Sequence, residues 1–197
     1  MATEATCLPC HPEGVEGQEE KSAEGQNKTL FVATDVHYLA SGGARAAAVV
    51  AADAAFSRLV ADRVELVSEV KPYQPGQFYL RELPPLHAAL DGLAGIALLV
   101  VDGYADLDPD GQPGLGAHAR AEFGVPVIGV AKTAFRTATH AIPVLRGASA
   151  RPLYVTAAGM SRADAAEFVR QMAGRHRMPD ALRRADTLAR HGLIRTG

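Results

Sequence analysis

A continuous apolar run covers residues 96–101, ends at Asp102-Gly103, and leaves few options for the fold. Six apolar residues without polar alternation are typical of a strand that is covered on both faces. A second buried strand is expected at residues 125–130 and a later strand at residues 153–156. Residues 84–93 have apolar side chains at helical spacing, and residues 116–123 form a shorter helix candidate. This alternation of buried strands with helices predicts a layered α/β structure.

Three further strands are expected before that region, at residues 30–36, 44–52 and 63–70. Ser41-Gly42-Gly43 and a charged turn around Asp62 separate them, and such short links favour antiparallel pairing. Two helices are expected after residue 160. The first has a capping-box pattern at Ser161 and Asp164, and the second covers residues 179–190. We therefore expect one mixed central sheet, three antiparallel strands followed by alternating helix and strand, flanked by helices.

Residues 1–28 are polar and rich in Gly and Glu, so we expect a flexible N-terminal tail there and one folded domain over residues 29–197. The tail contains Cys7 and Cys10 in a CxxCH string, a pattern of covalent haem attachment or of a redox pair. No basic, apolar signal peptide precedes it, which favours two reduced thiols and a cytoplasmic protein.

Charge and hydropathy exclude two broad classes of function. No apolar run approaches the roughly 18 residues that cross a bilayer, so no membrane partner is expected. The formal net charge is −2, from 20 Lys and Arg against 22 Asp and Glu. Proteins that coat nucleic acid through bulk charge are usually clearly basic. Any contact of this chain with nucleic acid must therefore be local.

Three carboxylates stand where a strand is expected to end or a helix to begin, at Asp35, Glu82 and Asp102. A buried carboxylate is costly unless a cation or a basic group neutralises it. Oxygen ligands suit Mg²⁺ or Mn²⁺, so the three together predict a metal site. Each residue taken alone is better explained as a solvated turn cap, and only the combination favours a metal site.

The segment at residues 71–78 holds Tyr73 between Pro72 and Pro75 and is predicted to be stiff. Such a loop could wedge into a base stack and help to extrude a nucleotide, and it could equally be a packed Pro-Tyr turn. Later in the chain, Gly129-Val130-Ala131-Lys132 combines small residues, which let a flat ligand approach, with one cation.

Together these motifs resemble the endonuclease V family, nucleases that cleave next to deaminated adenine (inosine). The resemblance covers nearly the whole expected domain. It rests on Asp35-Val36, Pro72 to Gly76, Arg81-Glu82, Val101 to Gly103, Leu115 to His118, and Val125 to Lys132.

The resemblance implies an RNase H-like fold and a monomeric endonuclease of DNA repair, acting on inosine-containing DNA or RNA. It implies that Asp35, Glu82 and Asp102 hold Mg²⁺, with Mn²⁺ as a substitute, that Asp186 adds a further ligand, and that Lys132 steadies the phosphate. The strand-separating wedge would be Pro72, Tyr73, Gln74 and Pro75. The base pocket would be walled by Gly76, Phe78, Gly103, Ala117, Gly129 and Ala131, and His118 falls on a further motif position.

The chain departs from the family pattern after Asp102. Asp108 and Asp110 stand where the family has a histidine and an arginine. Acidic replacements should weaken binding to a phosphate backbone, or they could hold an extra metal. Two other functions therefore stay open, a non-cleaving binder descended from the nuclease and a phosphodiesterase acting on another modified nucleotide. Of the other histidines, His37 and His140 are expected at the surface and His87 on an exposed helix face.

Overall fold

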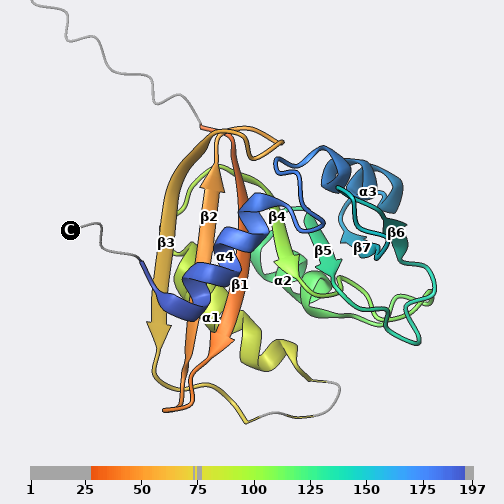
Figure 1. Cartoon of the computed structure of the whole chain (residues 1–197). Coiled ribbons are helices and arrows are strands. Elements are labelled where there is room, and N and C mark those ends of the chain that lie inside the picture. Colours follow the sequence, from red (N-terminus) through yellow and green to blue (C-terminus); the bar gives the residue numbers. More distant parts are fainter. Residues whose placement is uncertain (1–27, 73, 75–76, 194–197) are drawn as a thin grey trace, which may run out of the picture.

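The computed structural model describes residues 28–72, 74 and 77–193 and contains a central sheet with helices on both faces (Figure 1). The strands of this part are β1 (Leu30–Tyr38), β2 (Ala44–Ala51), β3 (Leu59–Val67), β4 (Ile96–Asp102), β5 (Val127–Ala131), β6 (Ile142–Val144) and β7 (Leu153–Ala158). Its helices are α1 (Tyr79–Leu90), α2 (Leu115–Phe123), α3 (Arg162–Gln171) and α4 (Asp180–His191). None of these helices is long and apolar enough to cross a membrane.

The strands form one mixed sheet in the order β3-β2-β1-β4-β5-β7-β6. β1, β2 and β3 pair antiparallel through short connections. β4 then adds to β1 in parallel, and β5 adds to β4 in parallel. β7 and β6 complete the sheet with antiparallel pairs. The predicted mixed sheet is confirmed, and the parallel centre places the ends of β4 and β5 at one edge.

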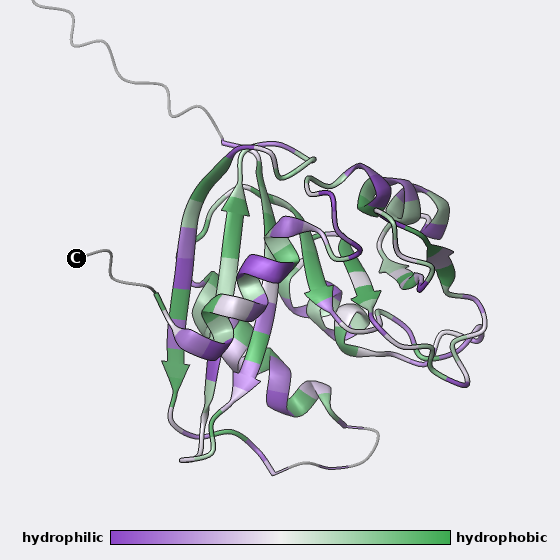
Figure 2. Ribbon diagram, viewed as in Figure 1, coloured by the Kyte–Doolittle hydropathy of each residue, from purple (hydrophilic) through white to green (hydrophobic). Residues whose placement is uncertain are grey.

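Alternate residues of the central strands face different helical layers, as the two-residue period of a strand requires. Val32 and Val101 pack with Leu86 of α1 and Ala119 of α2. Ala33, Val100 and Val130 pack on the other face, against residues of α3 and α4 such as Val169 and Ala185. Figure 2 shows apolar residues along the central strands and polar residues on the outer side of α4.

The third strand begins earlier than the sequence pattern predicted. β3 starts at Leu59, so Asp62 lies inside the strand and not in a turn. Its carboxylate accepts hydrogen bonds from both Nε and Nη2 of Arg184, which lies 122 residues later on α4. The pairing neutralises Asp62 within the strand, whereas its charge had suggested a turn in the sequence.

The helix expected from residue 84 begins at Tyr79 instead, so Pro84 and Pro85 lie within it. Hydrogen bonds from Leu80 N to Gln77 O and from Arg81 N to Phe78 O, both 3.0 Å, form the turn before the prolines. Proline is best tolerated near a helix start, where backbone N–H groups lack partners. A helix that begins at Pro84 fits this preference better than one in which Pro84 is the sixth residue. Strand β6 was not predicted, because three residues carry too little pattern.

Candidate active site

Two of the predicted carboxylates lie side by side on neighbouring parallel strands. Thr34 of β1 is in register with Val101 of β4, and Asp35 and Asp102 are the next residue of each strand. Both side chains follow the alternation of Ala33 and Val100 and so project toward the layer of α3 and α4. Asp102 ends its strand, as expected. Asp35 lies inside β1, which continues to Tyr38, so the prediction of a strand end there was wrong.

Glu82 approaches from the opposite layer, in the first turn of α1, and only 5% of its surface is exposed. The hydroxyl group of Tyr38, at the end of β1, donates a hydrogen bond of 2.6 Å to its Oε1. The guanidinium group of Arg81 lies over the ring of Tyr38, 4.0 Å from its centroid. Burial and the charge of Glu82 raise the pKa of Tyr38, so it stays a donor. Sequence reasoning missed Tyr38, because only the fold brings it to Glu82.

The acidity of the carboxyl groups shows that they share one electrostatic environment. Burial and the charge of Asp102 raise the pKa of Asp35 to about 7, with a further contribution from Asp186. Burial raises the pKa of Glu82 to about 7 against the hydrogen bond from Tyr38, and the charges of Asp35 and Asp102 add to the rise. Mutual repulsion of this kind is relieved when a cation binds between the groups.

Lys132 supplies one cation to this centre, directly after β5. Its Nζ lies 2.5 Å from Oδ2 of Asp102. Burial lowers its pKa, but the hydrogen bond to Asp102 and the charges of Asp102, Asp35 and Asp186 outweigh burial and raise it. Asp186 of α4 and Lys132 line the same small cavity of about 150 Å³. The carboxylate of Asp186 also accepts hydrogen bonds of 3.1 Å from Nε of Arg190.

The donor chemistry of this centre fits a hard divalent cation. Its groups are carboxylate oxygens, and the pKa values of Asp35 and Glu82 are raised by burial first and by neighbouring negative charge second. Within the described residues, no three His, Cys, Asp or Glu side chains are already close enough to hold a metal ion. The four carboxylates therefore converge on one region without forming a closed cage, and Lys132 partly neutralises them.

A mostly apolar cavity of about 330 Å³ adjoins Asp102. Of the residues expected to wall the base pocket, it contains Phe78 and Gly103. Tyr104, which the sequence indicated as a position that could change the pocket, and Phe135, which it did not, complete the aromatic lining. The other residues that line it are Asp102, Tyr79, Leu107, Pro113, Gly114 and Leu115.

Three further predicted pocket residues, Ala117, Gly129 and Ala131, lie outside the lining of this cavity. Ala131 ends the buried strand β5, and Ala117 lies in α2. Gly129 has a packing role, because a Cβ atom there would lie 2.5 Å from Ala105 N and 2.7 Å from Gly103 O. The backbone that follows Asp102 therefore crosses β5 at a position that only glycine allows.

His118 also lies outside the cavity lining, on α2, where its ring stacks on the ring of Tyr79 with centroids 3.4 Å apart. Burial lowers its pKa. Tyr79 is itself a wall of the cavity, so His118 supports that wall from behind. Of the predicted wedge, Pro72 and Gln74 belong to the described part of the chain. Tyr73, Pro75 and the pocket residue Gly76 lie outside the described residues.

Side chains join the loop after β4 to the loop after β5. The hydroxyl group of Tyr104 donates to Thr133 O at 2.8 Å and accepts from Phe135 N at 2.9 Å. The hydroxyl group of Thr137 donates to Leu107 O at 2.6 Å. These bonds hold the two loops together around the cavity and next to Lys132.

The prediction of a surface position for His140 was wrong. Its side chain is only 5% exposed, and its Nε2 lies 3.2 Å from Oδ1 of Asp106. The acidic loop that contains Asp106 thus finds a partner 34 residues later. Asp108, at one of the positions where the chain departs from the family pattern, accepts a hydrogen bond of 2.8 Å from Gln112 N and caps its own turn.

The chain matches the family model described as Endonuclease V over residues 15–187. Endonuclease V of Streptomyces avermitilis is 33% identical over 168 residues, which cover 75% of this chain and 73% of the relative. Endonuclease V of Streptomyces coelicolor is 33% identical over 181 residues, which cover 81% and 77%.

Solved structures of such proteins have the same fold. The crystal structure of the Streptomyces avermitilis protein has a TM-score of 0.67 at 32% identity and covers 83% of this chain and 81% of its own. A variant of Ciona intestinalis endonuclease V, in complex with a 23mer DNA containing an inosine followed by a ribo-adenosine, has a TM-score of 0.69 at 19% identity and covers 82% and 84%. The RNase H-like architecture that the motifs implied is confirmed.

Proposed function

This chain belongs to the endonuclease V family, and on that premise we propose that it is a metal-dependent endonuclease that nicks nucleic acid close to inosine, an activity of DNA repair. The single observation that carries the proposal is the convergence of Asp35, Glu82 and Asp102 with Lys132 at the edge where β4 and β5 end. The inosine-containing DNA bound by the Ciona intestinalis relative supports the choice of substrate.

Asp35, Glu82 and Asp102 would hold the metal ion, with Asp186 as a further ligand from α4. Their oxygen atoms favour Mg²⁺, with Mn²⁺ as a substitute. When bound there, such an ion activates water and stabilises the charge that develops on the phosphate. Tyr38 keeps Glu82 in place through its hydrogen bond of 2.6 Å. Lys132, already a partner of Asp102, is a cation that would steady the phosphate as a point charge.

The cavity beside Asp102 is the proposed site for the extruded base. Its aromatic and aliphatic walls fit a flat heterocycle, and a base bound there, beside Asp102, would lie next to the phosphate to be cut. Phe78 and Gly103 keep the role expected from the motifs, and Tyr104 and Phe135 join them. The wedge role of Tyr73 stays a prediction.

Cleavage of labelled oligonucleotides under single-turnover conditions tests the proposal. Inosine-containing and unmodified strands are compared, as DNA and as RNA, with Mg²⁺, Mn²⁺ or a chelator. We expect nicking only of the inosine strands and only with metal. Binding without nicking would instead identify a non-cleaving descendant of the nuclease. Neither binding nor nicking would direct the search to other modified nucleotides.

Asp102→Asn should lower the single-turnover rate on the inosine strand by at least about 10²-fold, because it removes a charged metal ligand next to Lys132. Asp91→Asn is the matched control, since Asp91 is an exposed aspartate at the end of α1, away from the carboxylates. The same labelled substrate and circular dichroism check rate and fold. A folded Asp102→Asn protein with unchanged rate would refute the metal role of this residue.

A further inference from the structure

The charged residues of this chain are divided unevenly along the sequence. Twelve of the 20 Lys and Arg residues follow Ala131, together with only four of the 22 Asp and Glu residues. This C-terminal part forms β6, β7, α3 and α4, the right-hand and front parts of Figure 1. A chain with a net charge of −2 thus has one strongly basic region, which begins at the proposed catalytic residue Lys132.

The start of β7 and the loop between α3 and α4 lie against Lys132. Ala131 of β5 pairs with Tyr154 of β7, so Lys132 lies beside the start of β7. This strand begins at Leu153, two residues after Arg151. Arg177, in the loop, donates hydrogen bonds from Nη2 to the carbonyl groups of Lys132 and Pro152. Lys132, Arg151 and the loop therefore form one continuous surface.

This loop has a rigid backbone, which matters because a fixed cation loses less entropy on binding. The buried guanidinium group of Arg146 donates to the carbonyl groups of Met172, Gly174, His176 and Arg177. A Cβ atom on Gly147 would lie 2.4 Å from Arg175 O, so the two backbones are in close contact. Arg175 therefore projects from a backbone that is held on both sides.

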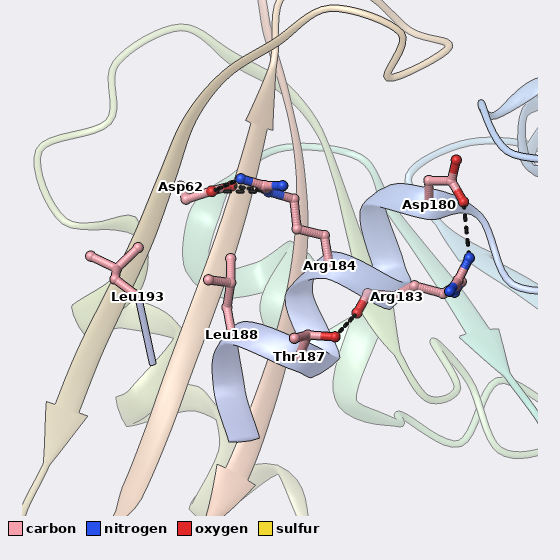
Figure 3. A pocket seen from close by; sticks show the side chains of 7 residues that line it. All are labelled: Asp62, Asp180, Arg183, Arg184, Thr187, Leu188 and Leu193. Carbon is pink, nitrogen blue, oxygen red and sulfur yellow. Dashed lines mark hydrogen bonds and ion pairs between the residues drawn. The ribbon is translucent and has the colours of Figure 1, made fainter. Parts of the chain in front are cut away.

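Within the described residues, four of the five arginines of α3 and α4 form ion pairs, whereas Arg151 and Arg175 do not. Arg183 pairs with Asp180 on the same helix. Arg184 pairs with Asp62 of β3 at the hollow between α4 and β3 (Figure 3). Arg170 and Arg190 pair with Glu167 and Asp186. Arg151 and Arg175 are exposed and form no ion pair with any residue that the structure describes. Their charges are available to a partner.

The loop that follows Asp102 has the reverse charge. Between Gly103 and Ala119 the sequence contains Asp106, Asp108 and Asp110 and no Lys or Arg. This loop is joined to the residues after Lys132 by Tyr104 and Thr137. A phosphate backbone at the centre would be repelled by this loop and attracted by the surface of Lys132, Arg151 and Arg175.

We infer that the substrate strand leaves the carboxylate centre over the surface of Arg151 and Arg175, and that these two arginines bind its phosphate groups. The inference rests on the proposed function for the position of the cut strand. Arg177 holds this surface in place through its backbone contacts, and the acidic loop repels the strand.

The test compares the wild type with the double variant Arg151→Ala/Arg175→Ala. Two probes are used, a single-stranded DNA with one inosine and the same strand with adenine. Single-turnover cleavage of the first gives a maximal rate and a half-saturating protein concentration, and fluorescence anisotropy of the second gives the dissociation constant, both from low to high KCl. Removal of one arginine that binds a phosphate group of a single strand should flatten the log–log salt dependence by about 0.7. For the two arginines we expect a flattening of about 1.4, an affinity lower by about tenfold, and an unchanged maximal rate.

Arg162→Ala is the matched control. Arg162 is also exposed and without an ion pair in the described part of the chain, but it begins α3 after the far end of β7, where Ala158 pairs with Val127. We expect its salt dependence to equal that of the wild type, and circular dichroism checks that every variant is folded.

The outcomes separate this inference from the proposed function. A double variant with wild-type affinity and salt dependence that still cuts the inosine strand would overturn the inference and leave the nuclease activity in place. An equal loss in Arg162→Ala would also overturn it, since the effect would then be general charge. If the double variant flattens the salt dependence of binding but the wild type never cuts the inosine strand, the phosphate-binding role of Arg151 and Arg175 is supported and the proposed function is refuted.

Discussion

Asp35 and Glu82 show how buried carboxylates can serve a site at the expense of stability. Each is largely removed from water beside other carboxylates, and the pKa of each rises to about 7 from an ordinary value near 4. In metal-free protein, the folded state therefore keeps protons that the unfolded chain releases between about pH 4 and pH 7. Below about pH 4 both groups are protonated in the folded and the unfolded state, so they cost no stability. As pH rises from about 4 to 7, the free energy of unfolding falls.

Asp35→Asn should therefore stabilise the metal-free protein at pH 8, although it removes a proposed ligand. One pKa unit corresponds to about 1.4 kcal/mol, so we expect a gain on the order of 1 to 3 kcal/mol that disappears toward pH 4. Urea unfolding in the presence of a chelator, at pH 8 and pH 4, measures this difference. A variant that is less stable than the wild type at pH 8 would contradict the cost of burying the charged Asp35 carboxylate beside Asp102.

Strand β5 illustrates how one element positions residues that it does not contain. Its neighbour β4 ends at Asp102, and the backbone from Gly103 to Ala105 then packs across Gly129. The hydroxyl group of Thr156, on β7, accepts a hydrogen bond of 2.7 Å from Ala105 N and fixes the same segment. The direction of Asp102 and the floor of the cavity thus depend on the absence of a side chain at Gly129 of β5.

Gly129→Ala should displace this segment, because the atoms that a Cβ would meet are backbone and cannot move aside cheaply. We expect a loss of about 2 kcal/mol in the free energy of unfolding and a large loss of cleavage. Val127→Ala is the comparison, since it removes buried methyl groups from the same strand without adding an atom near Gly103. Urea unfolding and cleavage of the inosine strand are measured for both. Retained cleavage in a folded Gly129→Ala protein would show that the close approach is not needed.

In the molecule as a whole, charged residues from two helical layers approach the carboxylates at one edge of the sheet. Glu82 comes from the layer of α1 and Asp186 from that of α4, while Asp35 and Asp102 belong to the sheet between them. A cation at this edge would bind the folded state alone, because the unfolded chain does not gather these groups. Metal binding and global stability should therefore be linked.

Mg²⁺ should raise the melting temperature of the wild type at pH 8 by about 5 °C when it is present at about 100 times its dissociation constant. Asp35→Asn should abolish most of this increase, and Asp91→Asn should retain it. Calorimetry with KCl at equal ionic strength excludes a general salt effect. An equal increase in wild type and Asp35→Asn would place the cation elsewhere.

The order of residues along the chain was enough to predict much of this protein. Unbroken apolar runs predicted β4, β5 and β7, because a strand covered on both faces has no polar alternation. Acidic residues at expected strand ends and at an expected helix start led to Asp35, Glu82 and Asp102, and a lone lysine after small residues led to Lys132. The motifs they form indicated the family, and the comparisons confirmed it.

Contacts between distant residues were decided only by the tertiary structure. Tyr38 meets Glu82 across 44 residues, Arg177 meets Lys132 across 45, and Arg184 neutralises Asp62 across 122. None of these pairs leaves a local pattern, because a side chain's partner depends on how the layers stack and not on its neighbours in sequence. The start of β3, the support of Glu82 and the walls of the cavity followed from that stacking, since burial and charge are properties of the assembled fold.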